Sequence, residues 1–192
     1  RIKRFKERSE TTTIFVVDAS GSSAIHRLAE AKGAVELLLA DCYVRRDQVA
    51  VIAFRGKQAE IILPPTRSLV RAKRGLSGLP GGGGTPLAMA IDASMQLALS
   101  IARKGETPLV VMLTDGKANL DRDGNPGREK AQADAMLAAQ QFAAAGFAAM
   151  IIDTSPQPSD AAQKLSLQMH ARYMPLPHAG AAQVSQAVKS MV

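Results

Sequence analysis

Stretches of consecutive apolar residues alternate with amphipathic stretches along most of the 192-residue chain. Continuous apolar runs are typical of strands buried on both faces, whereas apolar residues spaced three and four apart predict helices. We expect strands at residues 12–17, 49–54, 59–63, 109–113, 147–152 and 172–176. We expect helices at residues 23–40, 68–76, 87–102, 128–145, 159–170 and 181–191. This alternation predicts an α/β fold: a Rossmann-like, doubly wound, mostly parallel six-stranded sheet with helices on both faces.

The third predicted strand departs from the parallel pattern. A short turn, Arg55-Gly56-Lys57, joins it to the second strand, which predicts an antiparallel strand at the edge of the sheet. We expect Pro64 and Pro65 to end this strand, because proline has no N–H to donate to a ladder. Gly146 follows the helix expected at residues 128–145 and is placed to end it.

Length and composition indicate one globular domain. A chain of 192 residues, 46% of them hydrophobic, is long enough for a full core but short for two domains. We expect residues 1–10, which begin RIKRFKER, to be a basic linker or lead-in and residues 11–192 to form the domain. The chain begins with Arg1 rather than Met, so we expect it to be part of a longer protein.

Two features of the sequence indicate the compartment. No apolar run is long enough to span a membrane, so no membrane span is expected. The lone cysteine, Cys42, excludes a disulfide within the chain and favours a reducing, cytoplasmic location. We expect Cys42 to be a small buried residue rather than a nucleophile.

The charge balance predicts an acidic protein partner. Lys and Arg number 24 against 17 Asp and Glu, a formal net charge of +7. Aromatic residues make up only 4% of the chain, and no nucleic-acid-binding motif is present in the sequence, so nucleic acid is not expected. Basic side chains would steer an acidic surface toward the domain. The predicted docking residues are Arg55, Arg71, Lys73 and Arg74, with Arg45, Arg46 and Arg67 adding to the field.

Candidate ligand oxygens occur in three predicted loops: Asp18, Ser20 and Ser22 after the first strand, Thr85 before a helix, and Asp115 after the fourth strand. The carboxyl ends of parallel strands share one edge, so these residues are expected to meet there. Three hydroxyls and two carboxylates suit Mg²⁺, and leave it able to take a carboxylate from a partner. The alternative is that Ser20 or Ser22 only caps the following helix.

The motifs of several enzyme classes are missing. Neither the four glycines at residues 81–84 nor Gly116-Lys117-Ala118 forms a phosphate-binding loop, and no dinucleotide-binding glycine pattern follows the first strand. Ser20 lacks the flanking residues of a serine hydrolase. A metal-dependent phosphotransferase using Asp18 and Asp115 stays open, although hydroxyl-rich ligation favours recognition. The remaining candidates are assigned no catalytic role: His26, His170, His178 and Asp153, the last expected in a turn or cap.

The pattern Asp18-x-Ser20-x-Ser22, with Thr85 and Thr114-Asp115-Gly116, resembles the metal-ion-dependent adhesion site of von Willebrand factor A (integrin I) domains. The resemblance covers residue 11 to the C-terminus and implies the fold of that family. It also implies a bound Mg²⁺ or Mn²⁺ in contact with Ser20, Ser22 and Thr85. Asp18 and Asp115 would bind the ion directly or through water.

A narrower resemblance is carried by VVDASGSSA, by AFRGKQAEIILPPTRSLVRAKRGLSGLPGGGGTPLA and by LTDGKANL. These segments are similar to the C-terminal domain of the magnesium-chelatase D-subunit family, whose complexes insert Mg²⁺ into protoporphyrin IX for chlorophyll and bacteriochlorophyll. The resemblance implies an AAA+ ATPase I subunit and a porphyrin-binding H subunit as partners. The domain itself would be a non-catalytic part of this ATP-dependent ligase and bind no nucleotide.

Three alternatives remain at this point. The domain belongs to the related cobaltochelatase subunits, or its site delivers Mg²⁺ directly to the porphyrin, or the site is vestigial on a purely structural domain.

Overall fold

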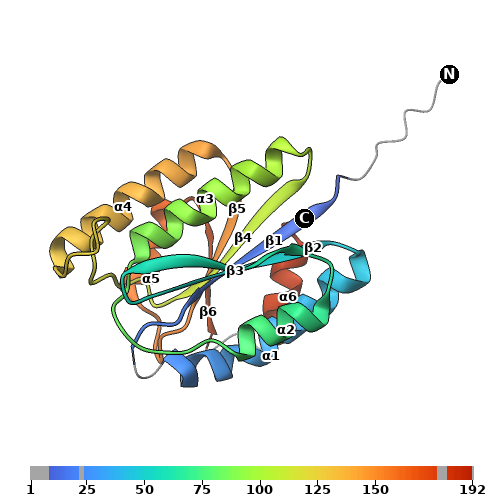
Figure 1. Ribbon diagram of the computed structural model, residues 1–192, viewed down its shortest axis with the longest axis horizontal. Helices are drawn as coiled ribbons and strands as arrows, with labels where there is room; N and C mark the ends of the chain where they lie inside the picture. Colours follow the sequence, from blue (N-terminus) through green and yellow to red (C-terminus); the bar gives the residue numbers. More distant parts are fainter. Residues whose placement is uncertain (1–8, 22–23, 177–180, 192) are drawn as a thin grey trace.

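The computed structural model describes residues 9–21, 24–176 and 181–191. In this part of the chain a six-stranded sheet runs in the order β3-β2-β1-β4-β5-β6 (Figure 1). All neighbouring strands are parallel except β2 and β3, which confirms the mostly parallel sheet with one antiparallel edge strand. The strands are β1 (Thr11–Asp18), β2 (Gln48–Arg55), β3 (Gln58–Thr66), β4 (Thr107–Thr114), β5 (Ala148–Asp153) and β6 (Arg172–Pro175).

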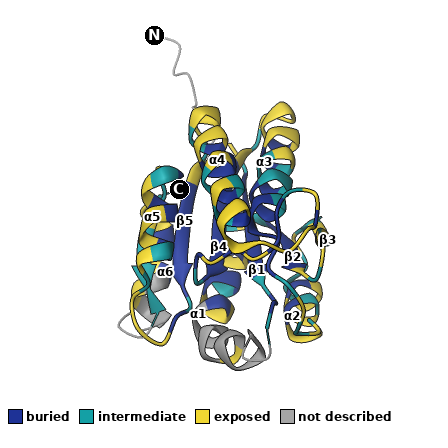
Figure 2. Ribbon diagram, turned by 90° about the vertical axis from the view of Figure 1, so that its left-hand side faces the viewer, coloured by how far each residue is buried: buried dark blue, intermediate teal, exposed yellow. Residues whose placement is uncertain are grey.

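Helices cover both faces of the sheet (Figures 1 and 2). One face packs against α3, α4 and α5, and the other against α1, α2 and α6. The helices are α1 (Ala24–Arg45), α2 (Leu69–Ser77), α3 (Leu87–Arg103), α4 (Arg128–Ala145), α5 (Asp160–Gln168) and α6 (Ala181–Lys189). None of the described helices has the length and apolar character needed to cross a membrane.

The central strands are buried on both faces because each side chain points into one of two cores. On β1, Ile14 and Val16 face the α3–α5 layer, whereas Phe15 and Val17 face the layer of α1, α2 and α6. All four are fully buried. This two-sided burial is why β1 is a continuous apolar run rather than an alternating one.

The strand order places a crevice beside the end of β1. The chain passes from β1 to β2 in one direction and returns to β4 on the other side of β1, so the order reverses between β1 and β4. Helices therefore leave to opposite faces at this point, and open α/β sheets bind their ligands there. The loops after β1 and β4 carry the expected site residues.

The expected end of β3 at its prolines is wrong. β3 runs through Pro64 and Pro65 to Thr66. Val51 pairs with Leu63 and Val49 pairs with Thr66, so the two prolines lie opposite one residue of β2. An irregularity of this kind on an edge strand accommodates proline, because the missing N–H donors are not needed by a further strand.

Other local expectations are confirmed, apart from the end of the first helix. Helix α4 has the predicted bounds, and Gly146 ends it in the left-handed conformation with φ 75°. Helix α1 continues to Arg45, beyond the expected end at residue 40, with Cys42 buried on its inner face. Burial raises the pKa of the Cys42 thiol, as expected for an unreactive residue. The predictions for residues 1–8, Ser22, His178 and the side chain of His26 lie outside the described residues.

Candidate metal centre

The first part of the site is the turn that follows β1. Asp18 is the last residue of the strand, and its Oδ1 accepts the backbone N–H of Ser20 at 3.0 Å. The Ser20 hydroxyl donates to the same oxygen. These two bonds hold the Ser20 Oγ beside the carboxylate. Ser20 is buried, with 5% of its surface exposed.

The second part is the glycine-rich segment before α3. The Thr85 Oγ1 donates to Ser20 Oγ at 2.7 Å, although 65 residues separate the two in sequence. Backbone bonds fix this approach: Gly82 N–H donates to Ala19 O at 2.9 Å, and Gly21 N–H donates to Gly83 O at 3.3 Å. The glycines thus let the two loops lie against each other, and the hydroxyls of Ser20 and Thr85 meet.

The third part is the end of β4. The Thr114 Oγ1 donates to Asp18 Oδ2 at 3.1 Å, so both carboxylate oxygens of Asp18 are held by hydroxyl groups. Asp115 is the next residue, and its Oδ1 accepts the N–H of Lys117 at 3.0 Å. Burial and the nearby negative charge of Asp115 raise the pKa of Asp18 to about 6, against the lowering effect of its bonds from Ser20 and Thr114.

A cleft of about 600 Å³ opens over these loops and is lined by Ser20, Thr85 and Asp115, among others. The structure therefore brings together four of the five predicted residues; Ser22 lies outside the described residues. No group of three or more His, Cys, Asp or Glu residues in the described chain is arranged to hold a metal. A metal here would depend on hydroxyl as well as carboxylate oxygen, a donor set that fits a hard cation such as Mg²⁺.

Two side chains that support the site were missed by the sequence analysis. The Asn119 Oδ1 accepts the N–H of Thr85 at 2.6 Å and so fixes the third hydroxyl. Gln132 accepts the N–H of Ala118 and donates to Gly116 O, both at 3.1 Å, which fixes the loop that carries Asp115. No spacing rule in a single sequence points to either residue, because each acts on a loop far away in the chain.

The predicted docking residues lie on two elements: Arg55 on β2 and the other three on α2. Arg55 ends β2 and so lies at the same edge of the sheet as Asp18, with which Phe54 is in register. Helix α2 starts beyond Thr66, at the end of the sheet away from Asp18, and runs back toward the site. Arg74, in the last turn of α2, therefore lies closer to the site than Arg71 and Lys73 do. All four predicted docking side chains are exposed.

Asp153 has the structural role expected for it. Its carboxylate accepts the N–H of Ser155 at 2.9 Å, the N–H of Ser159 at 2.7 Å and the hydroxyl of Tyr173 at 2.7 Å. Burial and this carboxylate raise the pKa of Tyr173 to about 12. Asp153 thus organises the loop between β5 and α5 and is not part of the hydrogen-bonded group around Ser20. His170 follows α5 at the exposed surface, with φ 52°.

The fold and the arrangement of the three loops define a family. The sequence signature of the von Willebrand factor type A domain matches residues 13–117, and the chain belongs to this family. Among curated proteins, the chain is 51% identical over 185 residues to the magnesium-chelatase 60 kDa subunit of Cereibacter sphaeroides. It is 43% identical over 200 residues to the magnesium-chelatase 67 kDa subunit of Chlorobaculum tepidum.

These matches cover 96% and 99% of this chain but only 33% and 32% of the two relatives. The chain therefore spans about a third of the length of the magnesium-chelatase subunits it matches. Solved structures show the same fold at low identity. The vWF domain of the type V pili tip protein Mfa5 from Porphyromonas gingivalis superposes with a TM-score of 0.73 at 12% identity, covering 95% of each chain.

Proposed function

We propose that this chain is the metal-dependent docking domain of a magnesium-chelatase D-type subunit. Its place would be in the cytoplasmic, ATP-dependent complex that inserts Mg²⁺ into protoporphyrin IX. Similarity to magnesium-chelatase subunits over nearly the whole chain supports the choice of complex. The observation that carries the docking role is the convergence of Asp18, Ser20 and Thr85 in one hydrogen-bonded group beside Asp115.

The proposed ligands of Mg²⁺ or Mn²⁺ are Asp18, Ser20, Ser22, Thr85 and Asp115. When bound, the ion would supply a Lewis-acidic position for a carboxylate oxygen of the partner. The chain's own residues hold the donor atoms in advance: Asp18 fixes the Ser20 hydroxyl, and Ser20 fixes the Thr85 hydroxyl. Two carboxylates only balance the divalent charge, so the ion would still be able to take one more oxygen ligand, the carboxylate of a partner.

The proposed partners are the AAA+ ATPase I subunit and the porphyrin-binding H subunit of the chelatase. Docking of an acidic side chain would hold the subunits together or transmit ATP-driven movement to the porphyrin subunit. The domain itself would carry out no chemistry. Its positive net charge of +7 would favour the approach of an acidic partner surface.

Replacement of Ser20 by Ala in the full-length subunit tests the proposal. We expect loss of Mg²⁺-dependent binding to the ATPase and porphyrin-binding subunits in a pull-down, with the same loss when wild type is treated with a chelator. Ser100→Ala is a matched control, because Ser100 is exposed on α3 away from the site. Unchanged pull-down by Ser20→Ala would reject metal-dependent docking.

The same variant separates docking from delivery of Mg²⁺ to the porphyrin. On the docking proposal, covalent crosslinking of Ser20→Ala into the complex restores insertion of Mg²⁺. If the site instead delivers the ion, assembly survives the substitution while insertion stops, and crosslinking restores nothing. Calorimetry that detects no Mg²⁺ binding by wild type would indicate a vestigial site.

A further inference from the structure

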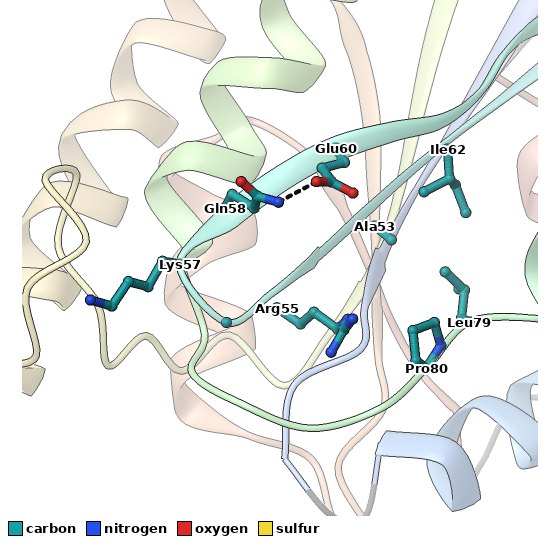
Figure 3. Close-up of a pocket in the computed structure, with 9 residues that line it drawn as sticks. Ala53, Arg55, Lys57, Gln58, Glu60, Ile62, Leu79 and Pro80 are labelled. Atoms are coloured by element: carbon teal, nitrogen blue, oxygen red, sulfur yellow. Dashed lines mark hydrogen bonds between the residues drawn. The ribbon is translucent and has the colours of Figure 1, made fainter.

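A second hollow lies beneath the β2–β3 hairpin (Figure 3). Its volume is about 430 Å³, and we call it the hairpin pocket. An apolar wall is formed by Ala53, Ile62, Leu79 and Pro80, with Arg55 and Glu60 as polar members. The pocket is separate from the cleft over the metal centre, because the two have no lining residue in common.

The hollow exists because α2 is shorter than the hairpin it covers. Helix α2 ends at Ser77, and the chain continues past Gly78 to Leu79 and Pro80 below the hairpin. Ala53 pairs with Glu60 and Arg55 pairs with Gln58, which puts these side chains on the face of the hairpin toward α2. The small side chain of Ala53 leaves the space unfilled.

The pocket is lined by two cations, Arg55 and Lys57, against one carboxylate, Glu60, and this excess of positive charge favours an incoming anion. The Glu60 carboxylate accepts the amide of Gln58. Among the residues that the structure describes, neither Arg55 nor Lys57 makes an ion pair. Figure 3 shows Arg55 extending along the hollow toward Pro80, whereas Lys57 extends away from it. The Arg55 guanidinium, which forms no ion pair within the described part of the chain, thus lies beside an apolar wall.

The pocket and the metal centre meet where the backbone of Gly56 lies against Gly83 and Gly84. Gly56 lines the hairpin pocket, and Gly83 lines the cleft that contains Ser20 and Thr85. A Cβ atom built on Gly83 would lie 2.9 Å from the backbone N of Gly56, so the two backbones touch. One extended segment that crosses this contact reaches both hollows.

We propose that the hairpin pocket is a second recognition site for the same partner segment that binds the metal. This inference rests on the proposed docking function and gives the chemistry of the segment. One carboxylate coordinates the metal, a neighbouring apolar side chain packs against Leu79 and Ile62, and a second carboxylate pairs with Arg55. A lone acidic residue on the partner surface is therefore insufficient, because the partner must present acidic, apolar and acidic side chains in one extended stretch.

The test measures how tightly the full-length subunit binds the chelatase ATPase and porphyrin-binding subunits in Mg²⁺. Arg55→Glu reverses the charge at the pocket without removing a buried group. We expect it to weaken the Mg²⁺-dependent binding of these subunits by roughly tenfold or more, mainly through slower association at low salt. Leu79→Ser removes apolar wall and is expected to weaken binding by a similar factor through faster dissociation.

Arg103→Glu is the matched control. Arg103 is exposed in the last turn of α3, at the end of the sheet away from the site and the hairpin pocket. The substitution is expected to leave affinity within about twofold. Direct Mg²⁺ affinity is expected to be unchanged in Arg55→Glu. If Arg55→Glu lowers Mg²⁺ affinity as much as partner affinity, its effect runs through the metal centre and the second site is rejected.

The outcomes distinguish this inference from the docking function. If Ser20→Ala abolishes binding while Arg55→Glu and Leu79→Ser match Arg103→Glu, docking stands and the hairpin pocket has no role. If Arg55→Glu weakens binding while Ser20→Ala does not, metal-dependent docking is rejected and the shared segment with it. If wild type binds neither subunit, both proposals are rejected.

Discussion

Two aspartates at the same end of the sheet, Asp18 and Asp121, have opposite electrostatic surroundings. Asp121 accepts Lys130 Nζ at 2.6 Å and the N–H groups of Asn125 and Asp123 at 2.8 and 2.9 Å. Lys130 makes the largest contribution, and together these bonds lower the pKa of Asp121 to about 2. Asp18 is held by hydroxyls and one N–H, and burial raises its pKa to about 6.

The difference separates a carboxylate whose charge the fold stabilises from one whose charge the fold disfavours. Asp121 has a lysine and two backbone donors, so its charge is stabilised within the fold. Asp18 is partly buried beside a second acidic residue, so its charged form is disfavoured until a positive charge arrives. Proteins place groups with such shifted pKa values at functional sites, and this supports Asp18 rather than Asp121 as the metal-binding carboxylate.

The largest effect is expected from Asp18→Asn. Removing the carboxylate should weaken Mg²⁺ binding by more than roughly a hundredfold, beyond the range for outer-shell partners of a metal. Asp121→Asn, the matched change at the other carboxylate, should leave Mg²⁺ affinity within about twofold. Isothermal titration calorimetry measures both. Equal losses in the two variants would show that the two carboxylates do not differ in metal binding.

A second expectation concerns the pH dependence of stability without metal. Because folding raises the pKa of Asp18 from 3.8 to about 6, the contribution of its neutral form is complete below pH 3.8. It is lost as pH rises through about 6. Asp18→Asn cannot ionise, so its unfolding free energy relative to wild type should rise by up to about 3 kcal/mol between pH 4 and pH 7.

Urea denaturation in the presence of a chelator measures this difference. Comparing the two proteins at each pH cancels the contributions of the other titrating groups. Saturating Mg²⁺ at pH 7 should then stabilise wild type but not Asp18→Asn. Parallel pH profiles for the two proteins would show that Asp18 titrates as it does in the unfolded chain.

At the structural carboxylate, Lys130→Met should lower the melting temperature by roughly 5 °C, because it leaves buried Asp121 without its cation. Mg²⁺ affinity should not change, since Lys130 does not line the cleft over Ser20. Thermal denaturation followed by circular dichroism gives the first quantity and calorimetry the second. A change in metal affinity without loss of stability would reverse the roles assigned to the two regions.

The smallest effect is expected from Gln132→Ala, which frees the loop of Asp115. We expect Mg²⁺ affinity to fall by roughly tenfold, as for other groups that orient metal ligands. Gln140→Ala on the same helix is the control, because its side chain is exposed. Gln132→Glu keeps one acceptor for Ala118 N–H but loses the donor to Gly116 O, so it should restore affinity only in part. Equal affinity in wild type and Gln132→Ala would remove the positioning role.

Most of the fold was predictable because the central strands are continuous apolar runs, and each ends in a loop with polar residues. The meeting of Asp18, Ser20 and Asp115 was predictable for the same reason, because parallel strands carry their ends to one edge. Thr85 follows no strand and lies between α2 and α3, so its place beside them depends on the packing of that loop. Pro64 and Pro65 were assigned wrongly because their acceptance in β3 depends on its edge position and irregular pairing with β2.

The supporting contacts could not be predicted from spacing. Asn119 reaches the backbone of Thr85, 34 residues away, and Gln132 reaches Gly116, 16 residues away. Such contacts depend on how helices and loops pack once the sheet has formed. The hairpin pocket likewise depends on where α2 stops relative to β2 and β3, which the helical pattern indicates only to within a few residues.

The backbone at Gly116 has a mechanical consequence. Its φ is 76°, and a side chain there would collide with the backbone of Ala161 and Ala162 at the start of α5. The loop and the helix therefore touch main chain to main chain, with no flexible side chain between them to absorb displacement. A displacement of Asp115 would therefore be transmitted directly to α5, so force applied at the ends of the strands would reach the helices on that face of the sheet.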